Sequence, residues 1–247
     1  MIELNEKDRS PSPDFSPFAS TNEGLTALPK YKAAGDTALD FGGLLDDPVK
    51  VHEDLASGCG GQLWPAGMVL AKHMLRYHRD KLQHARILEL GAGGGIVSLA
   101  VAKGCRLNSP LYMTDQPEME LLMKHNITLN GLEGKVLPKI LSWGEALSAD
   151  IVDFKPDTIL AADCVYFEPA FPLLTQTLKD LLALCPTTTV YFCFMKRRRA
   201  DMQFIRAAKK VFQVTEMVDE DRPVFSRQAH ARYTLFLTWL LASYLYF

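Results

Sequence analysis

Two side chains able to handle a proton, Asp163 and Tyr166, stand three residues apart directly after the apolar run 157–162. The run is short and apolar and predicts a buried strand, so both side chains follow its exit. If the chain turns into a helix there, a carboxylate and a phenol face one cleft. The carboxylate can attract an ammonium group and receive its proton, while the phenol can hydrogen-bond the amine. An alternative stays open, in which Asp163 caps a helix and Tyr166 packs in the core.

A glycine-rich turn precedes these residues in the chain. The apolar run 86–90 predicts a strand, and residues 96–103 resume with helical spacing. Between them stand Gly91, Gly93 and Gly95. A strand, a glycine turn and a helix form the first half of a nucleotide-binding unit, where glycine lets the main chain approach a ligand. The dinucleotide-binding fingerprint Gly-x-Gly-x-x-Gly would need its third glycine at position 96, where this chain has Ile96.

Three further candidates lie next to predicted elements. Asp115 comes 20 residues after the last glycine of the turn, at the end of the predicted strand 111–114, where a carboxylate can accept both hydroxyls of a ribose. Trp143 follows the predicted strand 136–141 and can cover the face of an adenine. Trp64 stands ahead of the first predicted helix and has the same capacity. A helix cap for Asp115, and core positions for the tryptophans, are the alternatives.

The order of the predicted elements indicates an α/β fold. Strands alternate with helices of about 10 to 15 residues, which predicts a parallel sheet with helices on both faces. No helix separates the last two strands, so these should pair antiparallel at one edge. We expect a Rossmann-like, doubly wound, mostly parallel seven-stranded sheet with an antiparallel edge strand, and one or two extra strands in residues 41–55. The predicted strands are 86–90, 111–114, 136–141, 157–162, 189–194, 212–218 and 233–241, and the predicted helices 65–77, 96–103, 117–130, 171–184 and 199–210.

Composition narrows the classes of function. The chain has 247 residues, of which 48% are hydrophobic, enough for one domain with a full core. Its formal net charge of −2 argues against a general nucleic-acid binder, since such proteins usually carry a basic excess. The 5 cysteines form no Cys-x-x-Cys pair, and the 6 histidines have no metal-ligand spacing. We therefore expect no metal site and reduced thiols, as in a cytosolic or nuclear protein, and of these two locations we expect the cytoplasmic one.

The two ends of the chain differ from the predicted core. Residues 1–17 are polar and interrupted by proline, unlike a signal peptide. Few aliphatic side chains occur up to residue 30, so we expect residues 1–40 to be a mobile leader and 41–247 to be the folded domain. Residues 234–247 carry no charged side chain, but a membrane span needs about 20 apolar residues. We expect a monomer that does not contact membranes.

Five pieces of the sequence together resemble the seven-strand protein-lysine methyltransferases that carry an Asp-x-x-Tyr motif. They are Gly60-Gly-Gln-Leu-Trp64, Leu88-Glu-Leu-Gly-Ala-Gly, Thr114-Asp115, Trp143-Gly-Glu145 and Ala162-Asp-Cys-Val-Tyr166. The resemblance covers roughly residues 42–237 and implies a class I methyltransferase domain that uses S-adenosyl-L-methionine. It implies that Glu89 orients the methionine end of the cofactor and that Asp163 and Tyr166 are catalytic, on the acceptor side. The implied cofactor-binding residues are Trp64, Glu89, Gly91, Ala92, Gly93, Asp115, Trp143 and Ala162.

Four other pieces resemble, within this family, fungal enzymes that methylate a lysine of translation elongation factor 1-alpha. They are Ser57-Gly-Cys-Gly-Gly, Leu147-Ser-Ala-Asp150, residues 160–174 and Lys196-Arg-Arg-Arg-Ala-Asp201. The resemblance implies that this elongation factor is the protein partner. Gly94 departs from the family, which often has threonine or serine there, and should loosen the glycine turn. The basic run 196–199 follows a predicted strand, so we expect it at the rim of the cleft, as a docking patch for an acidic stretch or as a solvated turn.

Other classes of protein fit these residues less well. An oxidoreductase that uses NAD would need the missing glycine and a proton-donating Tyr/Lys pair or histidine at the site, and neither arrangement is found. A nucleic-acid amino-methyltransferase tends to carry Asn/Asp-Pro-Pro-Tyr, whereas Cys164 and Val165 replace the prolines. A fold kept only for binding would have lost the cofactor set. We therefore expect a protein-lysine N-methyltransferase acting on elongation factor 1-alpha, without direct nucleic-acid binding. Methylation of another protein, a nucleic acid or a small-molecule amine is the alternative.

Overall fold

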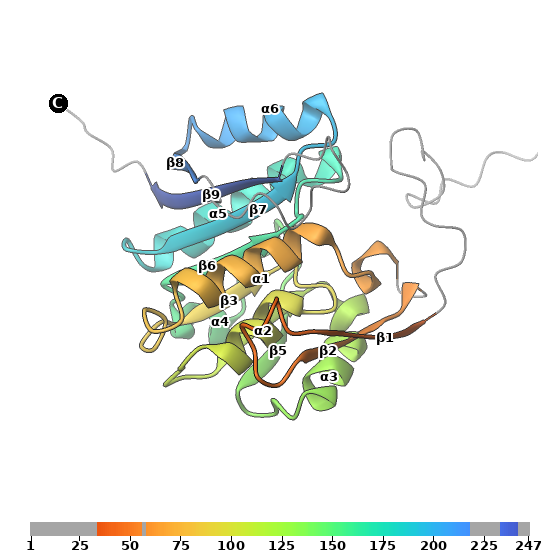
Figure 1. Ribbon diagram of the computed structural model, residues 1–247. Helices are drawn as coiled ribbons and strands as arrows, with labels where there is room; N and C mark the ends of the chain where they lie inside the picture. Colours follow the sequence, from red (N-terminus) through yellow and green to blue (C-terminus); the bar gives the residue numbers. More distant parts are fainter. Residues whose placement is uncertain (1–33, 56–57, 218–232, 242–247) are drawn as a thin grey trace, which may run out of the picture. The chain divides into compact units, whose positions relative to one another are not determined.

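The computed structural model describes residues 34–55, 58–217 and 233–241, all within one compact unit (Figure 1). Its described part contains a seven-stranded sheet with the order β5-β4-β3-β6-β7-β9-β8. Within this sheet β3, β4, β5, β6 and β7 pair in parallel, and β9 runs antiparallel to both of its neighbours. The strands are β3 (Ile87–Leu90), β4 (Leu111–Asp115), β5 (Val136–Ile140), β6 (Thr158–Ala162), β7 (Thr189–Met195), β8 (Phe212–Met217) and β9 (Tyr233–Leu241).

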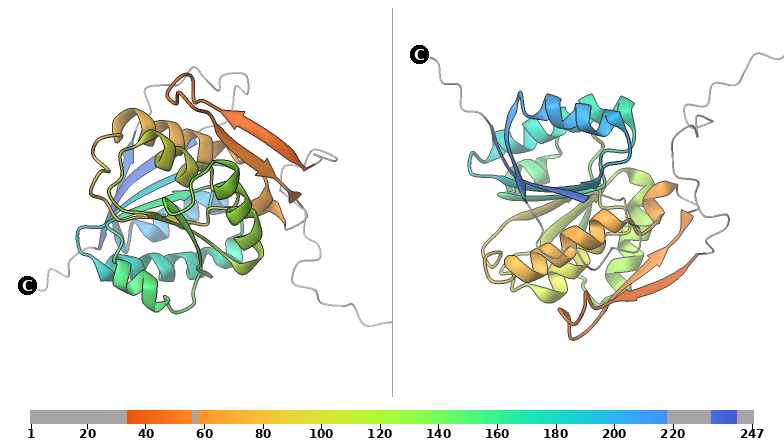
Figure 2. Two further views of the ribbon diagram at one scale, coloured as in Figure 1. Left: turned by 90° about the horizontal axis from the view of Figure 1, so that it is seen from below. Right: turned by 45° about the horizontal axis from the view of Figure 1, so that its top comes forward.

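Helices cover both faces of this sheet (Figure 2). Successive strand residues point to opposite faces, so Ile87 packs in the core formed with α1, α2 and α3, whereas Leu88 packs in the core formed with α4, α5 and α6. Pro65 begins α1 as the first helical residue, where its missing N–H has no partner to lose. The helices are α1 (Pro65–Tyr77), α2 (Ile96–Gly104), α3 (Glu120–Leu129), α4 (Ala149–Phe154), α5 (Phe171–Leu184) and α6 (Arg199–Ala208).

The predicted sheet and its doubly wound character are confirmed. The last two strands pair antiparallel at one edge, as predicted, but the antiparallel strand itself is β9, which lies between β7 and β8. The edge position belongs to β8. The short helix α4 is absent from the prediction, because 6 residues are too few to show a helical period. No helix in the described ranges is long and apolar enough to cross a membrane.

A two-stranded hairpin, β1 (Gly35–Leu39) and β2 (Val49–Glu53), lies beside the main sheet. Val49 and Val51 are buried, and β2 packs against α2 and α3. Strand β1 falls within residues 35–40, which the sequence assigned to the mobile leader, so that boundary was placed too late in the chain. The reason is that most side chains of β1 are exposed, and the strand shows no apolar alternation. Residues 1–33 of the predicted leader and residues 242–247 lie outside the described residues.

The order of the strands fixes where a ligand can bind. From β3 the chain moves outward through β4 to β5, and then returns to the other side of β3 to form β6. Strands β3 and β6 are neighbours, and the loops that leave their carboxyl ends therefore lead in opposite directions along the sheet. In open sheets of this kind, ligands bind at the carboxyl ends of the strands, at this reversal of order.

Candidate active site

The glycine turn after β3 is shaped by contacts that only glycine allows. Gly91, Gly93 and Gly95 all have positive φ angles, of 66°, 54° and 81°. A Cβ atom on Gly93 would lie 2.4 Å from the carbonyl oxygen of Gly60. The glycine turn is thus in close contact with the loop ahead of α1. Gly95 ends it as the residue immediately before α2.

Asp115 fastens this turn to the end of β4. One carboxylate oxygen accepts the main-chain N–H of Gly93 at 2.7 Å, and the other accepts that of Gln116 at 2.7 Å. Burial raises the pKa of Asp115, while these two hydrogen bonds act in the opposite direction. Asp115 does not precede a helix as its cap, since Gln116 occupies that position and makes no side-chain cap. The carboxylate remains half-buried at the carboxyl end of the strand, with acceptor capacity for further donors.

Glu89 lies deeper, one residue before the end of β3. Its side chain is buried, and one oxygen accepts the main-chain N–H of Ser98 in the first turn of α2 at 2.9 Å. An anionic group is favoured at this end of a helix. Burial nevertheless raises the pKa of Glu89 to about 7. Glu89 thus ties β3 to the helix that follows the glycine turn.

The loops after β5 and β6 converge on Gly91. A Cβ atom there would lie 2.9 Å from the Trp143 ring and 3.1 Å from the Cys164 sulfur. The Cys164 thiol donates to the carbonyl of Leu90 at 3.3 Å, which holds the loop after β6 against the end of β3. Ala162 is the last residue of β6 and is half-buried. The sequence-predicted cofactor residues of three strands therefore meet at one place.

Trp64 and Tyr166 approach from the side of α1. The indole N–H of Trp64 donates to the carbonyl of Cys59 at 2.9 Å. The Tyr166 side chain is near the Cys59 thiol, and its pKa is raised, mainly by burial and then by Cys59, so the phenol keeps its proton at neutral pH. Tyr166 as a whole is 40% exposed. It stands at the opening of the site, and the core position considered for it is not the one observed.

Asp163 is buried, with 6% of its surface exposed. Its main chain has a φ angle of 55°, and its N–H donates to the carbonyl of Cys193 at 2.8 Å. Its carboxylate accepts two hydrogen bonds from the Arg197 guanidinium, at 2.8 and 2.7 Å. The same guanidinium lies over the Trp64 ring, 5.3 Å from its centroid. Asp163 does not cap a helix, because the next helical turn starts only after Phe167.

The basic run 196–199 is divided by the structure. Arg197 turns inward to Asp163, and Arg198 donates to the Tyr166 carbonyl and to Asp201. Lys196 and Arg199 are exposed and border a hollow of about 430 Å³ together with Arg206. The two middle arginines are therefore engaged within the protein, whereas Lys196 and Arg199 stay at the surface. The sequence also provides no indication of Asn126 in α3, because the residue type alone does not predict its hydrogen bond to the Gly94 carbonyl.

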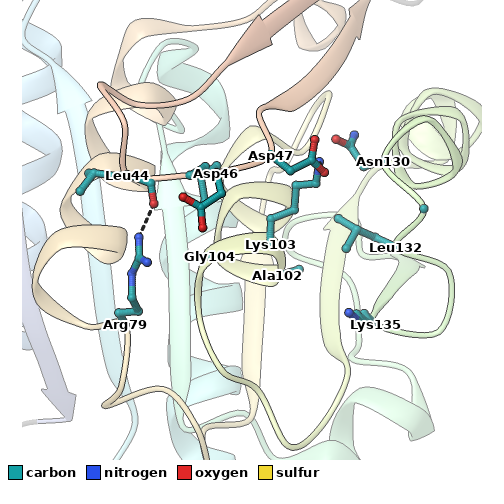
Figure 3. Close-up of a pocket in the computed structure, with 12 residues that line it drawn as sticks. Leu44, Asp46, Asp47, Arg79, Ala102, Lys103, Gly104, Asn130, Leu132 and Lys135 are labelled. Carbon is teal, nitrogen blue, oxygen red and sulfur yellow. Dashed lines mark hydrogen bonds and ion pairs between the residues drawn. The ribbon is translucent and has the colours of Figure 1, made fainter.

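A second hollow, of about 350 Å³, lies at the opposite edge of the sheet (Figure 3). It is bordered by the hairpin turn and by the ends of α2 and α3, where the chain enters the amino ends of the strands. Two of its cations are engaged there: Lys103 pairs with Asp47, and Arg79 donates to the Leu44 carbonyl. This hollow is separate from the converging loops, and no group of three potential metal ligands occurs among the described residues.

The site suits a nucleoside with an amino-acid end. Asp115 offers a carboxylate for hydroxyls, Trp143 offers a flat ring, and the glycine turn brings main-chain groups close. Fold and site define an S-adenosyl-L-methionine-dependent methyltransferase of the doubly wound α/β class. Within that class, residues 44–211 match the family model described as lysine methyltransferase. The chain belongs to this family and is a protein-lysine N-methyltransferase.

Individual proteins agree with this family. The chain is 39% identical over 221 residues to the protein-lysine N-methyltransferase EFM6 of Saccharomyces cerevisiae, covering 79% of this chain and 89% of the yeast protein. It is 27% identical over 174 residues to the EEF1A lysine methyltransferase 3 of Xenopus tropicalis, covering 69% and 74% of the two chains. Among solved structures, the 16S rRNA methyltransferase RsmC of T. Thermophilus, in complex with AdoMet and guanosine, shares the fold. Its TM-score is 0.56 at 15% identity, over 84% of this chain and 50% of that one.

Proposed function

We propose that this lysine methyltransferase acts on translation elongation factor 1-alpha. The resemblance of residues 160–174 and 196–201 to fungal enzymes with that substrate supports the proposal, as does the name of the Xenopus relative. The observation that carries the choice of site is the exit of β6, where Cys164 brings the Asp163–Tyr166 loop against the glycine turn. Because a translation factor works in the cytoplasm, we propose a cytoplasmic monomer.

The cofactor-binding part of the proposal rests on the loops after β3, β4 and β5. Each Asp115 oxygen accepts one main-chain N–H and keeps capacity for a ribose hydroxyl. The Trp143 ring, adjacent to Gly91, offers a face for the adenine. Glu89 supports the methionine end from below the turn. The proposed cofactor-binding set is Trp64, Glu89, Gly91, Ala92, Gly93, Asp115, Trp143 and Ala162.

The acceptor side must present a neutral amine. When bound, the cofactor supplies an electrophilic methyl group, and only an amine nitrogen with a free electron pair can receive it. Removing a proton from a lysine of pKa about 10.4 costs roughly 4–5 kcal/mol at pH 7. In the proposed mechanism Asp163 accepts an N–H of the amine and aims its nitrogen. The oxygen of Asp163 nearer to Arg197 Nη2 accepts only that one described hydrogen bond, so it has capacity for another. Tyr166 walls the entrance with a protonated phenol.

The decisive experiment combines ligand binding and methyl transfer. Calorimetry should show binding of S-adenosyl-L-methionine and none of NAD. The purified protein, incubated with labelled cofactor and recombinant elongation factor 1-alpha, should label one lysine, located by peptide mass spectrometry. Changing that lysine to arginine in the elongation factor serves as the matched control. Labelling of a different protein from a fungal lysate, with none of the elongation factor, would refute the substrate and leave the enzyme class intact.

A further inference from the structure

Arg197 is the one arginine of the run 196–199 whose guanidinium meets a buried carboxylate in the catalytic loop. Two parallel hydrogen bonds join it to Asp163, from Nη1 to Oδ1 at 2.8 Å and from Nη2 to Oδ2 at 2.7 Å. Only 15% of the Arg197 side chain and 5% of the Asp163 side chain are exposed. The guanidinium plane also contacts the Trp64 ring. Arg197 thus links Asp163, which follows β6, to Trp64, the residue ahead of α1.

The main chain of Arg197 is fixed independently of this ion pair. Its N–H donates to the fully buried carboxylate of Asp201 at 2.8 Å, and the N–H of Arg198 donates to the same oxygen at 2.8 Å. These bonds cap the first turn of α6. The guanidinium is therefore delivered from a rigid position. A lysine there could keep the charge, but it could not form the two parallel bonds.

This pairing has a consequence for the target amine. A buried carboxylate without a counter-ion would favour the ammonium form of a nearby lysine, which cannot accept a methyl group. Paired with Arg197, the carboxylate keeps an acceptor atom in place while its charge is balanced. We propose that Arg197 is a positioning residue, which aims Asp163 and offsets its charge so that the bound lysine is more easily deprotonated. The inference rests on the proposed function, because it requires a lysine amine beside Asp163.

The other ionisable groups around Asp163 do not duplicate this role. On the same loop, Cys164 and Tyr166 have raised pKa values and stay neutral near pH 7. On the cofactor side, burial raises the pKa of Glu89 to about 7 and also raises the pKa of Asp115. These carboxyl groups and the exposed Cys59 are unchanged in the variants below, so a difference between variants isolates the Asp163–Arg197 pair. The cation that reaches Asp163 within the described ranges is Arg197.

The test is the pH dependence of single-turnover methyl transfer to elongation factor 1-alpha at saturating substrate, which reports ionisations in the bound complex. Arg197→Met leaves Asp163 unbalanced and should move the acidic limb to higher pH, by about one unit or more. Asp163→Asn leaves the guanidinium unbalanced and should move the limb to lower pH. The double variant removes both charges and should return the limb close to the wild-type position. Arg197→Lys should keep the limb near wild type with a slower rate, because charge is retained and aim is lost.

Controls separate this role from a purely structural one. Lys209→Met removes one exposed charge at the other end of α6 and should leave the limb in place. Melting temperature and cofactor affinity are measured for every variant, and Arg197→Gln replaces Arg197→Met if the latter does not fold. If the acidic limb of the pH profile lies at the same pH in the wild type and in both single variants, the proposal is overturned. If the wild type labels only another protein, the proposed substrate fails, and the same comparison is made with the labelled protein.

Discussion

Asp163 is constrained at both its main chain and its carboxylate, and this decides how a substitution there should act. Its positive φ angle is held by the N–H bond to Cys193, and its carboxylate is held by Arg197. Asparagine tolerates positive φ angles better than most residues. Asp163→Asn therefore keeps the shape of the loop while removing the charge, so its effect on catalysis can be read separately from misfolding.

We expect Asp163→Asn to lower kcat/KM for the protein substrate by roughly 10- to 150-fold. The reason is the loss of one oriented, charge-assisted contact, worth about 1.5–3 kcal/mol. Cofactor affinity should be kept, because Asp115 and the glycine turn are untouched. Tyr166→Phe should cost less if the ring mainly walls the entrance. Steady-state kinetics at the pH optimum, with calorimetry for the cofactor, measure both. Wild-type turnover in a folded Asp163→Asn would remove this residue from the mechanism.

Glu89 should make stability depend on pH in an unusual direction. Its pKa is 4.5 when solvated and about 7 in the fold, so the folded state holds a proton that the unfolded chain releases. Stability should therefore fall as pH rises from 4.5 to about 7 and level off above, by about 3 kcal/mol in all. In Glu89→Gln this slope should disappear, while in the exposed Glu118→Gln it should persist. Urea unfolding at several pH values decides; an unchanged slope in Glu89→Gln would contradict the assignment.

At the scale of single elements, α6 presents two different surfaces. Its buried side packs on the sheet, while Arg199 and Arg206, seven residues apart, share an outer face. Together with Lys196 they border a hollow of about 430 Å³ that also contacts Met202 and Gln203. No acidic residue lines this hollow among the described residues. We call the three cations the basic face; its start adjoins the loop that carries Arg197 and so lies close to the acceptor side.

Changing the three cations of the basic face to glutamine should raise KM for elongation factor 1-alpha and leave cofactor affinity unchanged. Exposed charges each contribute about 0.2–1 kcal/mol, so the combined effect is about tenfold at low salt. Because rim charges act through encounter and are screened, the difference from wild type should shrink at high ionic strength. Kinetics at two salt concentrations measure this.

The matched control for the basic face removes the same number of positive charges near the amino ends of the strands, at the end of the sheet away from the active site. Lys81, Lys135 and Lys155 are exposed and lie shortly before the amino ends of β3, β5 and β6. Their change to glutamine should leave KM unaltered. Equal KM values for the two triple variants, at low salt, would mean that the basic face is only a solvated surface.

At the scale of the whole unit, a buried amide is one of the links between the hairpin and the glycine turn. Asn126 of α3 accepts the His52 N–H at 2.8 Å and donates to the Gly94 carbonyl at 2.9 Å. It has no exposed surface. The glycine turn is thus bonded at Gly94 to Asn126, which also bonds the hairpin, and at Gly93 to Asp115. Gly94, where the family often has a hydroxyl side chain, is anchored through its carbonyl instead.

We expect Asn126→Ala to lower both the unfolding free energy, by about 1–3 kcal/mol, and the affinity for S-adenosyl-L-methionine. The buried N–H of His52 and the carbonyl of Gly94 would both lose a partner. Asn130→Ala is the matched control, because Asn130 bonds the hairpin at Lys50 without touching the glycine turn. It should lower stability and keep cofactor affinity. Chemical unfolding and calorimetry are compared; equal cofactor affinities in the two variants would break the proposed link.

The sequence by itself determined the features that depend on neighbouring residues. A strand, a glycine turn and a helix can be read from 86–103, because apolar period and glycine spacing are local properties. The same holds for Asp115, the last residue of β4, and for Asp163, which follows β6, so both stand at the carboxyl edge of the sheet. Strand β1 and helix α4 were not predicted, because an exposed strand and a helix of about two turns leave no periodic pattern of apolar residues.

Tertiary structure decided which partner each of these side chains meets. Asp163 and Arg197 are 34 residues apart, and Asn126 and Gly94 are 32 apart, so no local pattern pairs them. The run 196–199 reads as four equivalent cations, yet Arg197 meets the buried carboxylate of Asp163 and Arg198 that of Asp201, while Lys196 and Arg199 are exposed. Burial sets these choices, because a desolvated charge or amide requires a partner wherever the folded chain supplies one.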